Sequence, residues 1–89
     1  MITLHLSDAA LVGLTLSGDS EAFESIVRRH QKKAHAVARA HGVPADVVED
    51  VVQETFLSAY RDLARLRDKA KFSQWLLAIV RNVARQYNR

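Results

Sequence analysis

Acidic and amide side chains gather on one side of residues 46–60 when this segment is wound as a helix. Most surface helices mix charge signs, so an unmixed acidic face indicates a surface for a basic partner. A solvated first turn, favoured by the helix dipole, explains the same pattern equally well. The acidic face contains no lysine or arginine and consists of Asp46, Glu49, Asp50, Gln53 and Glu54.

Guanidinium, amide and indole groups share one side of the last helical segment. Guanidinium groups bind phosphates, amides read base edges and an indole stacks on an exposed base. Exposed arginines are commonly only solvated, and a single tryptophan in a small domain commonly belongs to the core. Eight basic residues among the last 29 nevertheless favour nucleic acid. Two adjacent strips carry these groups, Gln74, Arg81 and Arg85 in one and Trp75, Asn82, Gln86 and Arg89 in the other.

Charge is divided unevenly along the 89 residues. Residues 1–60 hold five basic and eight acidic side chains, a net charge of −3, whereas residues 61–89 hold eight basic and two acidic ones, a net charge of +6. This division implies two partners of opposite charge, the basic end facing nucleic acid. The absence of cysteine fits a reducing, cytoplasmic setting, and no apolar run approaches the roughly 20 residues that span a bilayer.

No catalytic constellation can be identified. The four histidines lack partners at metal-binding spacing, and the three glycines are isolated rather than grouped in a phosphate-binding loop. The sequence therefore predicts no enzyme, no metal site and no cofactor.

Apolar periodicity predicts an all-α fold, a compact bundle of three main helices plus a short N-terminal helix. The short helix should span about 8–16, with Ser7 as N-cap. The next should run from 19 or 20 to about 41, and the third from Pro44 to 64 or 65. Residues 66–71 should form a loop, after which Ser73 caps the last helix. The predicted buried residues are Phe23, Ile26, Val27, His30, Ala34, Val37, Ala38 and His41, then Val48, Val51, Val52, Thr55, Phe56, Ala59 and Leu63, and finally Leu76, Ile79, Val80, Val83 and Tyr87.

Three segments resemble a known family. Residues 50–60, DVVQETFLSAY, resemble the second conserved region of bacterial RNA polymerase sigma factors of the extracytoplasmic-function group. Residues 18–23, GDSEAF, resemble that group's entry to its first long helix. Residues 72–84 resemble its F-x-x-W-L-x-x-I-x-x-N promoter-reading helix. Order and spacing agree from about residue 8 to the end, so the resemblance covers nearly the whole chain.

The resemblance implies two binding surfaces. In the family, the acidic helix docks on a basic coiled coil in the clamp of the largest subunit of core RNA polymerase. That role falls here to Asp50, Gln53 and Glu54, with Phe56 and Leu57 as contacting or supporting residues. The loop and last helix of the family open the Pribnow element of promoter DNA and hold a flipped base of the non-template strand. The matching positions are Leu66, Arg67, Asp68, Lys69, Ala70 and Lys71 in the loop, and Asn82 on the helix, with Trp75, Arg81 and Arg85 as further contributors.

The family pattern is incomplete in this chain. Residues 67–71 lack the glycine or serine that such loops often carry, so the resemblance does not determine which base is captured. A complete member has a second domain with a helix-turn-helix, and residues 1–89 are expected to be the first domain alone. The alternative hypothesis is a helical protein-interaction module with no DNA-melting role. An anti-sigma factor, as an inhibitory partner, fits both hypotheses.

Overall fold

Side-chain caps and glycines set the limits of the first two helices. In the computed structural model, which describes residues 5–87, α1 (Asp8–Leu16) begins where the Ser7 hydroxyl accepts a hydrogen bond from Ala10 N at 3.1 Å. Helix α2 (Ser20–Ala40) begins where the Asp19 carboxylate accepts hydrogen bonds from two backbone amides. Gly18 and Gly42, with φ of 105° and 91°, follow these helices in the left-handed conformation that glycine favours. Both predicted helices are therefore confirmed.

Helix α3 (Val48–Asp62) starts four residues later than the predicted start at Pro44. Residues 44–47 form a turn instead, in which Val47 N donates to Pro44 O at 3.1 Å. The φ of −121° at Val47 then interrupts helical geometry. Arg39 also fixes the approach to this turn, because its guanidinium donates to Val43 O at 3.1 Å. The predicted end of this helix at residue 64 or 65 agrees better with the structure, because a 3-10 turn, η2 (Leu63–Arg65), continues α3.

The predicted loop 66–71 contains a helical turn of its own. This 3-10 turn, η3 (Lys69–Lys71), leads directly into α4 (Phe72–Tyr87). Asp68 caps it by accepting a hydrogen bond from Ala70 N at 3.1 Å. The prediction that Ser73 caps the last helix is therefore wrong, because helical structure already begins at Lys69.

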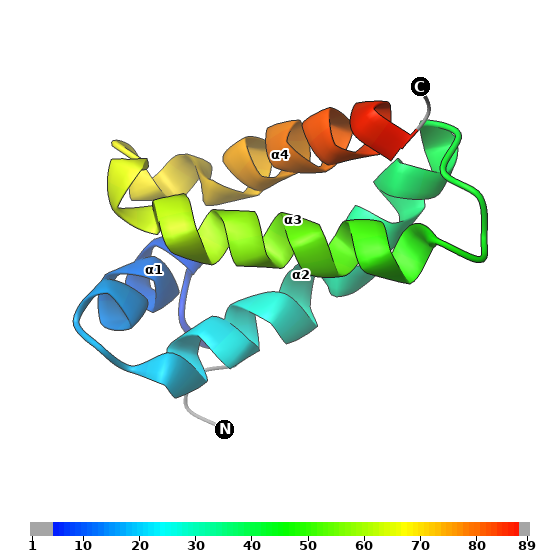
Figure 1. Cartoon of the computed structure of the whole chain (residues 1–89). Coiled ribbons are helices and arrows are strands. Elements are labelled where there is room, and N and C mark those ends of the chain that lie inside the picture. Colours follow the sequence, from blue (N-terminus) through cyan, green and yellow to red (C-terminus); the bar gives the residue numbers. More distant parts are fainter. Residues whose placement is uncertain (1–4, 88–89) are drawn as a thin grey trace.

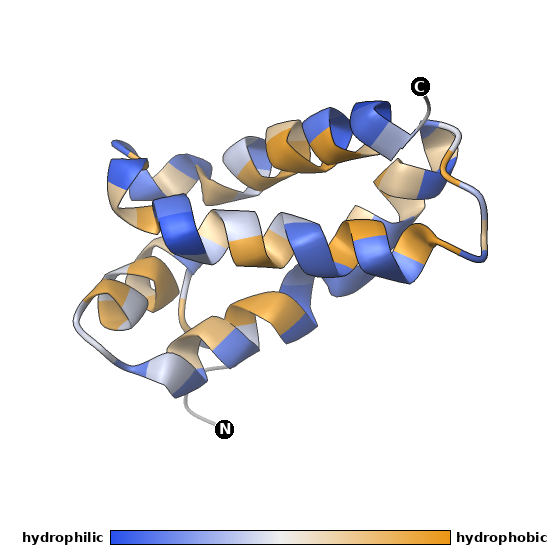
Figure 2. Cartoon of the chain, viewed as in Figure 1, coloured by the Kyte–Doolittle hydropathy of each residue, from blue (hydrophilic) through white to orange (hydrophobic). Residues whose placement is uncertain are grey.

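Within residues 5–87, four α-helices pack around one core (Figure 1). Helices α2, α3 and α4 contact one another, and α1 lies against α2 and beside η3. Their hydrophobic sides turn inward, as the orange faces in Figure 2 show. All seven buried residues predicted for the third helical segment are indeed buried, namely Val48, Val51, Val52, Thr55, Phe56, Ala59 and Leu63. No helix among the described residues is long and apolar enough to cross a membrane.

Two aromatic positions in the predicted core are wrong. His41 is exposed because α2 ends before it, and it forms the C-cap of that helix. Tyr87 is 41% exposed because it lies in the last turn of α4, where its hydroxyl reaches the surface of α3. His30, by contrast, is buried as predicted, at 9% exposure.

Candidate functional surfaces

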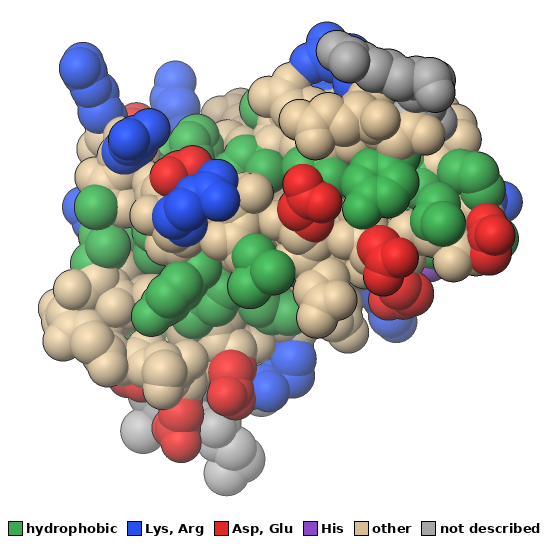
Figure 3. All heavy atoms as spheres, viewed as in Figure 1, with side chains coloured by type: hydrophobic (Ala, Val, Ile, Leu, Met, Phe, Trp, Pro, Cys, Tyr) green, Lys and Arg blue, Asp and Glu red, His purple; other side chains and the backbone are tan. Residues whose placement is uncertain are grey.

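The predicted acidic face lies on the outer side of α3. Asp50 and Gln53 are exposed, and Glu54 is half-buried. Figure 3 shows acidic side chains following α3 across the surface. Glu49 is also exposed, and its Oε2 lies 3.8 Å from His35 Nε2 on α2. Asp46 precedes the helix and is exposed in the turn before it. The polar side chains that were predicted to bind a partner therefore lie on the surface and are not part of the core.

One residue of α4 joins this acidic face. The hydroxyl of Tyr87 donates to Glu54 Oε1 at 3.5 Å. Partial burial and the nearby carboxylates of Glu54 and Asp50 raise the pKa of the Tyr87 phenol above its ordinary value of 10.0. The phenol is therefore a neutral hydrogen-bond donor beside two carboxylates.

An apolar groove runs beside the acidic face, between α2 and α3. Leu57 is 65% exposed and Tyr60 is 55% exposed at its edge. The Tyr60 ring meets Phe23 of α2 edge to face, with centroids 5.0 Å apart. Phe56 is only 6% exposed, so it supports the groove more than it lines its surface. We call this the α2–α3 groove, and its lining comprises Ser20, Phe23, Glu24, Val27, Gln31, Glu49, Val52, Gln53, Phe56, Leu57 and Tyr60.

Sequence reasoning missed half of the α2–α3 groove. Phe23 and Val27 were predicted as core residues, yet each is only half-buried. Tyr60 lies in the segment 50–60 that resembles the family, and the sequence alone assigns it no role. Phe23 and Val27 lie in α2, so only the packing of α2 on α3 reveals that they meet Tyr60 and Leu57.

The loop before α4 presents charged side chains on a buried anchor. Arg67, Asp68, Ala70 and Lys71 are exposed, and Lys69 is half-buried. Leu66 is only 9% exposed and belongs to the core, so its side chain holds the loop instead of lying open to a ligand. Figure 3 shows basic side chains projecting at this end of the molecule.

The predicted residues of α4 are largely exposed. Arg81, Asn82 and Arg85 all lie at the surface, and Arg85 Nη2 donates to Asn82 Oδ1. Trp75 is half-buried and packs on Phe72, with ring centroids 5.9 Å apart. Its indole thus serves the core and still offers an exposed part. Arg89 lies outside the described residues.

A second groove separates α3 from α4. Asn82 lines it from α4, and Arg61 and Asp62, whose side chains pair at 3.4 Å, line it from α3. None of the loop residues 66–71 lines this groove. Sequence reasoning missed Arg61, Asp62 and Ile79, because their proximity to Asn82 arises only from helix packing. This α3–α4 groove is lined by Glu54, Leu57, Ser58, Arg61, Asp62, Ile79, Asn82, Val83 and Gln86.

These surfaces define the class of protein: a small helical domain with an acidic face on one helix and basic and amide groups on another. Residues 26–89 match the family Sigma-70 region 2, and the chain belongs to this family. The family resemblance of the sequence and its all-α fold are thereby confirmed.

Known relatives extend the match to the N-terminal helices. The chain is 40% identical over 83 residues to the ECF RNA polymerase sigma-E factor of Escherichia coli K12, and 38% identical to that of Haemophilus influenzae. Each alignment covers 93% of this chain and 43% of the relative, so the chain spans less than half the length of these proteins. A solved NMR structure of an engineered region 2 of sigmaE in complex with GTAAAA is 42% identical, with a TM-score of 0.86. That alignment covers 93% of this chain and 86% of the other.

Proposed function

We propose that this domain binds core RNA polymerase through α3 and promoter DNA through the loop before α4 and α4 itself. One observation carries the proposal. Helices α3 and α4 pack side by side, and α3 presents acidic groups where α4 presents basic and amide groups. The relatives are named as RNA polymerase sigma-E factors, and the region 2 of sigmaE in the NMR structure is bound to GTAAAA.

The polymerase-binding surface combines charge with apolar area. Asp50, Gln53 and Glu54 face a basic coiled coil of the clamp, and Leu57 inserts beside them from the edge of the α2–α3 groove. Phe56 supports this surface from below. Interfaces of this kind derive most of their affinity from a few apolar and aromatic anchors, while surrounding charges set orientation and association rate.

DNA binding divides into phosphate and base contacts. Arg81 and the loop residues Arg67 and Lys71 attract phosphates, and Trp75 offers a face for stacking. A non-template base leaves the duplex and enters the α3–α4 groove beside Asn82. Extrusion costs a few kcal/mol, which stacking and hydrogen bonds to the base edge offset. Because Arg85 donates to the Asn82 oxygen, the amide NH2 remains available to donate to a base acceptor.

The polymerase surface is tested with the double variant Gln53→Ala, Glu54→Ala. We expect it to lose binding to a clamp coiled-coil fragment in a pull-down while its circular dichroism stays helical. Glu21→Ala is the matched control, because it removes an exposed carboxylate of α2 outside both grooves. Undiminished binding of the double variant would remove Gln53 and Glu54 from the interface.

The DNA surface is tested by fluorescence anisotropy with single-stranded non-template oligonucleotides. We expect binding that weakens with salt, and Asn82→Ala should lower the preference for a promoter sequence over a scrambled one. Unchanged preference would exclude Asn82 from the base site. Absence of binding even at low salt would refute the DNA role and favour a helical protein-interaction module.

A further inference from the structure

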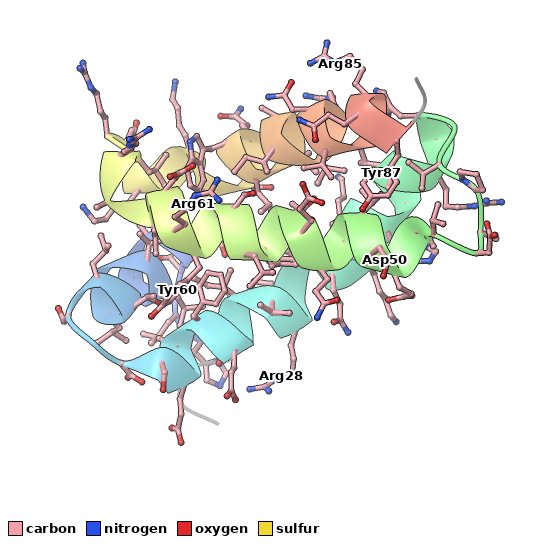
Figure 4. The ribbon with its side chains drawn as sticks, viewed as in Figure 1. Arg28, Asp50, Tyr60, Arg61, Arg85 and Tyr87 are labelled. Atoms are coloured by element: carbon pink, nitrogen blue, oxygen red, sulfur yellow. The ribbon has the colours of Figure 1, made fainter. Side chains whose placement is uncertain are left out.

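The last turn of α4 reaches back over the acidic face of α3. Figure 4 shows Tyr87 projecting from the end of α4 toward the helix that carries Asp50. The Tyr87 hydroxyl lies 3.5 Å from Glu54 Oε1, and the residue as a whole remains 41% exposed. Sequence periodicity predicts a core residue at this position, but Tyr87 is exposed. Burial in the core therefore does not explain where this side chain lies.

The geometry gives Glu54 a fixed neighbour. A glutamate on a helix surface has several rotamers, and ordering it on binding costs conformational entropy. A phenol that donates to one carboxylate oxygen reduces this freedom before the partner arrives. The carboxylate has about four lone-pair sites, so it can accept from Tyr87 and from a cationic partner together. The phenol is protonated at neutral pH, and thus a donor, because even an unperturbed tyrosine has a pKa of about 10.

We propose that Tyr87 is a positioning residue of the polymerase-binding surface, holding Glu54 in place for a lysine or arginine of the partner. The inference rests on the proposed function of α3. It extends the surface from α3 onto α4, the helix otherwise assigned to DNA. The exposed part of the Tyr87 ring adds a second point of attraction for the same cation.

The test removes only the hydroxyl, in Tyr87→Phe. Affinity for the clamp coiled-coil fragment is measured by titration calorimetry with residues 1–89. We expect about threefold to tenfold weaker binding, equivalent to about 0.7–1.4 kcal/mol. Glu21→Ala is the control, because its exposed carboxylate lies outside both grooves and its loss should leave the affinity for the coiled-coil fragment unchanged.

A double-mutant cycle separates positioning from general destabilisation. In a Glu54→Gln background the partner's cation finds no carboxylate at position 54, so Tyr87→Phe should cause no further loss. Equal losses in both backgrounds would show that the hydroxyl acts independently of Glu54 and would overturn the inference. So would unchanged affinity of Tyr87→Phe in the wild-type background.

The same titrations distinguish this failure from failure of the proposed function. If Gln53→Ala, Glu54→Ala abolishes binding while Tyr87→Phe leaves it unchanged, the α3 interface stands and the role of Tyr87 falls. If the unmodified domain does not bind the coiled coil, the proposed interface fails and the role of Tyr87 fails with it.

Discussion

The imidazole of His30 meets the ring of Phe72 edge to face, with centroids 5.4 Å apart, and so joins the middle of α2 to the first residue of α4. His30 Nε2 also lies 2.9 Å from Asp8 Oδ1 at the start of α1. Phe72 in turn packs on Trp75. Helices α1, α2 and α4 thus meet at one buried cluster, and two of them, α1 and α4, also contact η3 in the loop before α4.

Removal of the Phe72 ring should weaken this junction strongly. Phe72 is fully buried, so Phe72→Ala should reduce the free energy of unfolding by about 3–5 kcal/mol through lost burial and a residual cavity. Urea denaturation followed by circular dichroism measures the loss. Leu14→Ala is the control, because Leu14 is 38% exposed and its truncation should cost about 0.5 kcal/mol or less. Equal losses in the two variants would contradict the packing of Phe72 at this junction.

The Asp8 pair should matter more than the ion pairs on the open surface. Asp8 Oδ1 accepts from Arg29 at 3.1 Å and contacts His30 at 2.9 Å, with a side chain only 22% exposed. Asp8→Asn should therefore lower stability by about 1–2 kcal/mol. Glu24→Gln is the matched control, because its 3.9 Å pair with Arg28 is about two-thirds exposed and should contribute about 0.5 kcal/mol or less. The free energy of unfolding of both variants is measured by chemical denaturation near neutral pH. Similar losses in the two variants would show that the Asp8 pair contributes no more than the exposed pair.

Phosphate and base contacts should respond differently to salt. Arg81→Ala should weaken oligonucleotide binding for all sequences and reduce the slope of log affinity against log salt by about 0.7, the value for one contact to single-stranded DNA. Asn82→Ala removes no charge, so its slope should stay that of the unmodified domain while its sequence preference falls. Anisotropy titrations over a range of salt concentrations measure both quantities. A change of slope in Asn82→Ala, or none in Arg81→Ala, would reverse the assigned roles.

Local signals predicted most of the fold. Ser7, Asp19 and the left-handed glycines mark helix ends through backbone geometry that depends on few neighbours. The α3 start could not be predicted equally well, because Pro44 suits either a first helical turn or the β-turn that Val43 and Arg39 stabilise here. The start of α4 was missed because Asp68 caps the chain earlier than Ser73.

The candidate surfaces were predictable only where they lie on one helix. Asp50 and Gln53 follow from the periodicity of α3, and Asn82 from that of α4. The grooves depend on packing between helices, which is why Phe23 beside Tyr60, and Asp62 beside Asn82, could not be foreseen.

The alkaline titration of Tyr87 tests its contact with Glu54. Glu54→Gln removes one carboxylate and weakens the contact, so the raised pKa of the phenol should move back toward 10.0, with burial and Asp50 retaining part of the shift. Absorbance of the phenolate is measured in a Tyr60→Phe background, where Tyr87 is the one remaining tyrosine. A phenol whose pKa is raised by folding stabilises the folded state fully below the unfolded-state pKa, and this contribution is lost as pH rises through the folded-state pKa. Stability should therefore decline above about pH 10, the unperturbed tyrosine pKa, and less steeply in Glu54→Gln. Identical titration midpoints with and without Glu54→Gln would show that the carboxylate does not act on the phenol.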